Sequence, residues 1–188
     1  MNQKQDGSAL CRKAPELICP AGSPLALDAA IEGGADAVYL GSGDFNARMN
    51  AANFTNIELR EGVRRAHSFG AKVYLTLNTL VYDREINAYL QAAYEAQAAG
   101  VDALIVADLG GAALLHRAFP ALPLHASTQM SAHNAAAGGL LHALGFSRMV
   151  VARELSLEQL RAVTAVSPIE VEASIHGALC VCHSGQCL

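Results

Sequence analysis

The last seventeen residues of the chain concentrate the side chains best suited to chemistry. They include three cysteines, two histidines and a glutamate: Cys180, Cys182, Cys187, His176, His183 and Glu172. Thiolates are nucleophiles and soft metal ligands, so closely spaced cysteines suit zinc or an iron–sulfur centre, and a nearby imidazole can bind metal or move protons. Gly177 and Gly185 allow the backbone to turn tightly around such a centre. The alternative is that these thiols are small buried hydrophobic groups.

Two strings in this segment carry a family resemblance. Glu172-x-x-x-His176-Gly177-Ala178-Leu179-Cys180, followed by Ser184-Gly185-Gln186-Cys187, resembles the signature of peptidase family U32, the collagenase-like peptidases. The family usually has Phe where Ser174 stands. Family members also continue beyond the position of Leu188, so we interpret the chain as the N-terminal part of a family protein.

The resemblance implies a TIM-like barrel over residues 16–188 and two classes of activity. The family name implies hydrolysis of peptides by a collagenase-like (metallo)protease. Several members are similar to enzymes that hydroxylate RNA bases, or a related aromatic quinone precursor, without oxygen. In relatives with a 4Fe-4S cluster, the first two ligands resemble Cys180 and Cys187, and two further cysteines follow later. The ligand set in this chain is therefore expected to be incomplete, with Cys182 or Cys19 as further candidates.

Composition places the chain among globular proteins. Its 188 residues are 52% hydrophobic and 16% charged, which is enough for one buried domain. A net charge of −4 disfavours a surface built for unaided binding to nucleic acid or anionic membranes. The polar start and the lack of a long apolar run predict a cytoplasmic protein without a membrane span. In that compartment, five cysteines indicate free or metal-binding thiols.

Short strand-like runs alternate with Ala-rich helical segments after a polar tail at residues 1–15. The seven runs are 16–19, 37–40, 72–77, 103–106, 124–127, 148–152 and 170–175. This alternation is typical of βα units with parallel strands. We predict an α/β fold, a (β/α) TIM-like barrel with about seven of eight units, in a single domain at 16–188. A doubly wound open sheet is the alternative, although no G-x-G-x-x-G string supports nucleotide binding.

Polar residues follow the predicted strands, where parallel barrels carry their functional groups. They are Cys19, Arg48, Asn78, Asp108, Ser127-Thr128-Gln129, Arg153-Glu154 and His176. Asn78, Asp108 and Ser127-Thr128 can also serve only in turns or backbone hydrogen bonds. His125 and His133, which flank the Ser-Thr-Gln triplet, are interpreted as structural histidines.

The strings "FNAR", "STQMSAHN" and "ARELS" resemble other recurring strings of the family. This resemblance supports four residues as site candidates: Arg48, Gln129, Arg153 and Glu172. Guanidinium groups in a cleft recognise carboxylates or phosphates, but either arginine can instead pair with a nearby carboxylate. If Glu172 points into the barrel, it can act as a general base or orient His176. The predicted catalytic set is Arg48, Asn78, Gln129, Arg153, Glu172 and His176. The predicted cluster or metal ligands are Cys180, Cys187 and Cys182.

Three functions follow from these observations. Clustered thiolates in a reducing compartment favour an iron–sulfur enzyme that hydroxylates RNA bases or a small aromatic substrate. A peptidase acting on peptides is the alternative, although the H-E-x-x-H and G-x-S-x-G strings are absent. The third is an inactive fragment or binding module without a cofactor. An open barrel would also expose two strand edges, through which we predict homo-oligomers.

Overall fold

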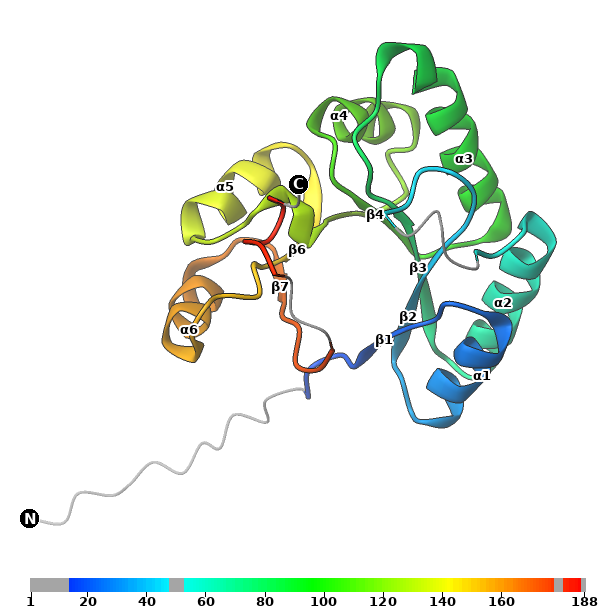
Figure 1. Cartoon of the computed structure of the whole chain (residues 1–188), viewed down its shortest axis with the longest axis horizontal. Helices are drawn as coiled ribbons and strands as arrows, with labels where there is room; N and C mark the ends of the chain where they lie inside the picture. The colour runs from blue at the N-terminus through cyan, green and yellow to red at the C-terminus, as the bar shows by residue number, and fades with distance from the viewer. Residues whose placement is uncertain (1–13, 48–52, 178–180, 187–188) are drawn as a thin grey trace, which may run out of the picture.

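The computed structural model describes residues 14–47, 53–177 and 181–186. In these residues seven parallel strands form one sheet in chain order, and Figure 1 shows the sheet curled into an open ring with the helices outside it. The strands are β1 (Ile18–Pro20), β2 (Ala37–Gly41), β3 (Lys72–Leu77), β4 (Ala103–Val106), β5 (Leu124–Ala126), β6 (Phe146–Val150) and β7 (Glu170–Glu172). The helices are α1 (Pro24–Glu32), α2 (Asn56–Ser68), α3 (Ile86–Ala99), α4 (Leu109–Ala118), α5 (Ala135–Ala143) and α6 (Leu157–Val166), with 3-10 turns η1 (Asp83–Glu85) and η2 (Thr128–Met130).

This arrangement confirms the predicted TIM-like barrel with seven βα units. The consecutive strand order excludes the doubly wound alternative, in which the order reverses within the sheet. Several strand boundaries differ from the prediction, most of all those of the last two strands. The sixth strand begins at Phe146, directly after Gly145 takes a left-handed φ of 88°, and the seventh ends at Glu172, the last residue paired with β6.

Polar side chains fix where the loops end and the helices begin. At five helix starts the N-cap side chain accepts a backbone N–H from the first turn; these caps are Ser23, Thr55, Asp108, Asn134 and Ser156. Ser156 and Gln159 form the reciprocal capping box that their spacing predicts. Asp108, expected at the barrel opening, is therefore a structural cap whose carboxylate accepts from Gly111 N–H at 2.6 Å.

The two faces of the sheet are both buried, but against different surroundings. Side chains such as Val38, Leu104 and Met149 face the helices and form the main core. Cys19 packs against this same layer. The opposite face lines the barrel interior with a smaller apolar cluster around Tyr74 and Ile105. Because alternate strand residues point to opposite faces, parity decides which side chains reach the interior.

Candidate functional site at the carboxyl ends of the strands

The loops that follow the strands meet at one end of the barrel, here called the rim. Asn78 directly follows β3, and its side chain bonds to two of the other loops. Its Oδ1 accepts from Ala47 N–H at 3.0 Å, and its Nδ2 donates to Ser127 Oγ at 3.4 Å. Asn78 therefore lies at the rim as predicted, where it joins the loops after β2, β3 and β5.

The Ser127-Thr128-Gln129 triplet forms the start of η2. Ser127 is buried and caps the turn by accepting from Gln129 N–H at 3.3 Å, while Thr128 Oγ1 donates to the Val151 carbonyl at 3.4 Å. These bonds match the structural alternative for the first two residues. Gln129 differs, because its Oε1 is buried without a hydrogen-bond partner among the described residues. An unsatisfied buried acceptor at the rim is a candidate contact for a substrate donor.

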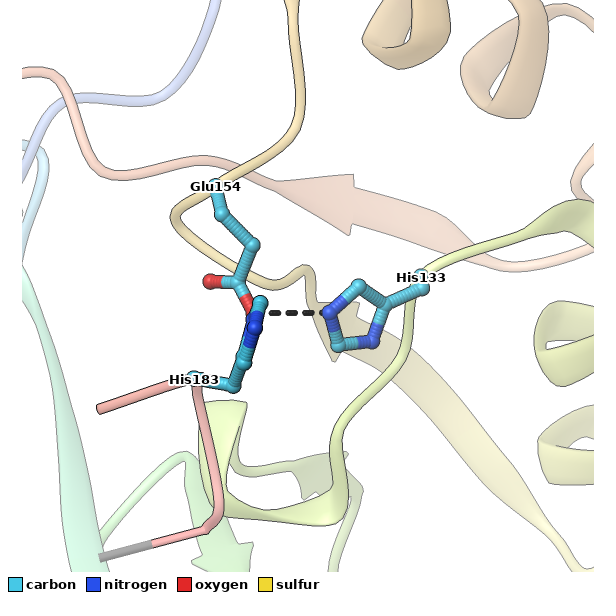
Figure 2. A group of neighbouring side chains, drawn as sticks. All are labelled: His133, Glu154 and His183. Atoms are coloured by element: carbon cyan, nitrogen blue, oxygen red, sulfur yellow. Dashed lines mark hydrogen bonds and ion pairs between the residues drawn. The ribbon is translucent and has the colours of Figure 1, made fainter.

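Four rim residues, His133, Glu154, His183 and Ser184, converge into what we call the rim cluster. His133 follows β5, Glu154 follows β6, and the other two lie in the segment after β7. Figure 2 shows His133, Glu154 and His183. One Glu154 oxygen, Oε1, lies 2.7 Å from His133 Nε2 and 3.3 Å from His183 Nδ1. The other oxygen accepts from Ser184 Oγ at 2.9 Å. One carboxylate thus joins its own segment to the segments after β5 and β7.

The protonation of the rim cluster follows from these contacts. Partial burial opposes ionisation of Glu154, but hydrogen bonds from Ser184 and His133 outweigh it and hold the pKa of this carboxyl well below its usual range. The pKa of His133 is raised because its ring bonds the Ser131 carbonyl and Glu154. Both of these partners accept hydrogen bonds, and together they favour the protonated form of the His133 ring.

A tight turn fixes the cysteine-bearing segment on the rim. Ser184 is buried, and its Oγ accepts from Arg153 N–H at 3.1 Å while its carbonyl accepts from Ser131 Oγ at 2.7 Å. Gln186 N–H bonds the His183 carbonyl at 2.9 Å, which confirms the chain reversal predicted at Ser184–Gly185. Gly185 has φ +82°, and a Cβ there would collide with Ser131 Oγ and the Gln129 carbonyl.

The remaining predicted residues fall into three groups. Arg48, Cys180 and Cys187 lie outside the described residues. Arg153 is half-buried at the rim, and His176 and Cys182 are exposed on the segment after β7. Glu172 points into the barrel, but it pairs with Arg148, whose Nη1 lies 3.6 Å from its Oε2. Among the described residues no hydrogen bond or ion pair joins it to His176, so the predicted tether is not formed.

Arg148 organises a second group, the interior cluster, made of Glu16, Tyr74, Arg148, Glu170 and Glu172. Only 7% of the Arg148 side chain is exposed. Its Nε and Nη2 donate to Glu170 Oε2 at 2.9 and 2.6 Å, and Nη2 also bonds Glu16, which accepts from Tyr74 Oη at 2.9 Å. Burial raises the pKa of Glu172 against the opposing effect of Arg148. The cluster connects the segment before β1 to β3, β6 and β7.

Sequence analysis missed His133, His183, Ser184 and Arg148 as site residues. His133 and Ser184 lie in sequence strings that were singled out for other residues of those strings. His183 was noted only as part of the cysteine-rich segment. Arg148 opens the run predicted as the sixth strand, and an arginine in a buried strand was a usable signal, because charged groups are rarely buried unless paired.

The chain is a parallel barrel whose polar groups gather at the carboxyl ends of the strands. This is the architecture of TIM-barrel enzymes. The profile of peptidase family U32 matches residues 22–188, and the chain belongs to this family. The match to the solved structure of a U32 peptidase covers 86% of this chain and 70% of that one, with a TM-score of 0.70 at 17% identity. At that identity the likeness shows the fold alone.

Curated relatives carry two kinds of name. The chain is 42% identical over 172 residues to the 23S rRNA 5-hydroxycytidine C2501 synthase of Escherichia coli, across 92% of the chain and 26% of that protein. It is 38% identical to tRNA hydroxylation protein P1 of Bacillus subtilis, across 97% and 43%, and 37% identical to a collagenase of Porphyromonas gingivalis, across 92% and 44%. The chain thus spans less than half the length of these relatives. None of the helices described is long and apolar enough to span a bilayer.

Proposed function

We propose that this chain forms the barrel of an oxygen-independent RNA hydroxylation enzyme whose iron–sulfur centre is held partly by Cys180 and Cys187. The relatives named for rRNA and tRNA hydroxylation support this activity over peptide hydrolysis, since the rRNA synthase has the higher identity. Apart from Cys180 and Cys187, which lie outside the described residues, the roles below are those of residues the structure describes.

The observation that carries the proposal is the anchored turn at Ser184–Gly185. It reverses the chain between the two signature cysteines, as two thiolates seven positions apart require if they share one centre. Its bonds to Glu154, Arg153 and Ser131 hold it at the rim, where barrel enzymes bind substrates. Cys182, exposed beside this turn, is a further candidate ligand. Cys19 is not, because it packs between sheet and helices.

When bound, an iron–sulfur centre supplies one-electron transfer. The rim residues would then bind the RNA base. Asn78 and Ser127 hold three loops together, so they position the opening, while the unpartnered Oε1 of Gln129 offers an acceptor to a base N–H donor. Arg153 would contact phosphate. Because the net charge is −4, RNA binding by this chain is expected to depend on these contacts rather than on a broad basic surface.

Anaerobic reconstitution with iron and sulfide tests the cofactor. Because the ligand set is incomplete, visible absorption should show at most a weak cluster, which is reduced further by Cys180→Ala or Cys187→Ala and unchanged by Cys19→Ala, the matched control from the helix-facing layer. A cluster of full intensity in the chain that lacks both signature cysteines would contradict the assignment.

Nucleoside analysis tests the activity. Deleting the gene that encodes the chain should remove a hydroxylated nucleoside from digests of total RNA. The intact gene should restore the nucleoside, and the same gene carrying Gln129→Ala should restore it poorly. An unchanged set of hydroxylated nucleosides in the deletion strain would contradict RNA hydroxylation.

A further inference from the structure

The rim cluster brings together three side chains that can each offer one atom to a metal ion. His133 Nε2, Glu154 Oε1 and His183 Nδ1 all lie within 4.8 Å of one another. Glu154 is 21 positions from His133 and 29 from His183, so the fold rather than a local motif makes the group. We propose that these three atoms form a binding site for a divalent transition-metal ion, separate from any centre held by the cysteines.

The distances from Glu154 to the two histidines can be compared with those around a small ion. An ion bound tetrahedrally at about 2.0–2.2 Å from nitrogen and oxygen ligands holds them roughly 3.3–3.5 Å apart. The distance of 3.3 Å between His183 Nδ1 and Glu154 Oε1 already fits this value. The 2.7 Å between His133 Nε2 and the same oxygen must open by about 0.6–0.8 Å, a side-chain adjustment, when an ion replaces the shared proton.

Hydrogen bonds around His133 and Glu154 orient these two ligands as in known metal sites. Metal-binding histidines usually donate their second ring N–H to a carbonyl or carboxylate, which fixes the ring and leaves the other nitrogen for the metal. His133 does so, because its Nδ1 bonds the Ser131 carbonyl at 2.7 Å and its Nε2 faces Glu154. The second Glu154 oxygen accepts from Ser184 Oγ, which steadies the carboxylate. A buried serine and a backbone carbonyl therefore support the site.

The ligand set also indicates the class of metal and the access to it. Two imidazoles and one carboxylate suit zinc or iron(II), whereas magnesium and calcium prefer oxygen ligands alone. The His183 side chain is 80% exposed, and the His133 and Glu154 side chains are 38% and 30% exposed. A bound ion would thus keep positions open to solvent at the rim. This is the pattern of metal sites that bind a water or a substrate oxygen rather than purely structural ones.

Titration calorimetry on the chelator-treated chain, with Zn²⁺ as the probe, tests the site. We expect one ion per chain, with affinity reduced at least tenfold by each of His133→Ala, Glu154→Gln and His183→Ala. His67→Ala is the matched control, because His67 also pairs with a carboxylate, Asp102 Oδ2 at 2.9 Å, but has no third ligand beside it in the part of the chain that the structure describes. This control should bind Zn²⁺ as the wild type does, and Mg²⁺ should not compete.

A separate measurement tests whether the cysteines bind the Zn²⁺ instead, since Cys182 adjoins His183. Cys182→Ser should bind Zn²⁺ with unchanged affinity, and Co²⁺ added to the wild type should give ligand-field bands without a thiolate charge-transfer band. His183→Ala keeps the result interpretable, because so exposed a side chain can be removed without unfolding, which circular dichroism would verify. The proposal is overturned if no stoichiometric Zn²⁺ binds, if the three variants bind like wild type, or if binding is lost only with the cysteines.

Discussion

The interior cluster and the rim cluster both pair carboxylates with basic side chains, yet their settings differ. In the interior, Arg148 is almost fully buried, with one carboxylate from the segment before β1 and two from β7 around it. At the rim, Glu154 binds loop residues that remain partly exposed. Buried charges are costly to leave unpaired, whereas exposed pairs can exchange partners at low cost. The interior therefore holds the open barrel together, and the rim is free to bind ligands.

Removing the interior cation should give the largest effect. Arg148→Met keeps much of the side-chain volume but leaves Glu172 without its cation and Glu16 with Lys72 alone, so we expect the free energy of unfolding to fall by about 3–5 kcal/mol. Urea denaturation measures this loss. Adding Glu172→Met to the same chain should recover part of it, because one of the unpaired carboxylates is then gone. A loss below about 1 kcal/mol would show that the interior pairs behave like surface pairs.

Acid should destabilise the interior through His125. Burial, helped by the nearby Arg148, lowers the pKa of His125 to about 3, whereas an unfolded histidine titrates near 6.5. Between these values only the unfolded state binds the proton, so stability falls as the pH drops from about 6.5 toward 3, by about 1.4 kcal/mol per pH unit. His125→Phe should flatten this slope in urea titrations at several pH values. Equal slopes in the two proteins would contradict the assignment.

A methyl group at Gly185 should disturb the rim without unfolding the barrel. Gly185→Ala places Cβ against Ser131 and the Gln129 carbonyl at a left-handed φ, at a local cost of about 1–3 kcal/mol. We expect faster hydrogen exchange in residues 181–186 and a nearly unchanged urea midpoint. Gly139→Ala is the control, since nothing lies near its added Cβ in α5, and it should stabilise by about 0.5–1 kcal/mol. Unchanged exchange in Gly185→Ala would refute the close contact.

The smallest loss of stability is expected from breaking an exposed ion pair. Arg65 and Asp28 join α2 to α1 at 3.0 Å with both side chains near half exposure. Asp28→Asn should cost about 0.2–1 kcal/mol, and the difference should vanish near 1 M salt, where the Debye length is about 3 Å. The cost of Arg148→Met should persist there, because the interior excludes screening ions. If salt removed both costs alike, burial would not explain the contrast between the two clusters.

Much of the fold could be predicted from local patterns. Strand runs, helix caps such as Ser156 and the βα rhythm depend on neighbours a few residues apart, and these gave seven parallel strands and the position of the rim. The turn at Ser184–Gly185 was predictable for the same reason. The ends of strands were less certain, since the last pair in a ladder depends on its partner strand, as with β7 after Glu172.

The candidate site could be predicted only in part. Asn78 and Gln129 lie at the rim because every strand end does, but the partners of Glu172 and His133 were not predicted. Glu172 was proposed as a base or tether, and its inward direction instead brings it to Arg148. His133 was interpreted as a lone structural histidine, and the loop after β6 gives it Glu154 as a partner. Neither partner lies close in sequence.

The sequence by itself determined the family, the parallel barrel and the rim, because these follow from composition, periodicity and motif spacing. Tertiary structure alone decided which rim residues meet and which strand face turns inward. Both faces of this sheet are buried, so hydrophobicity does not distinguish the interior, where Arg148 lies, from the helix-facing layer that contains Cys19. The closeness of His133, Glu154 and His183 depends on the curvature of the sheet and the paths of three loops, which no local pattern encodes.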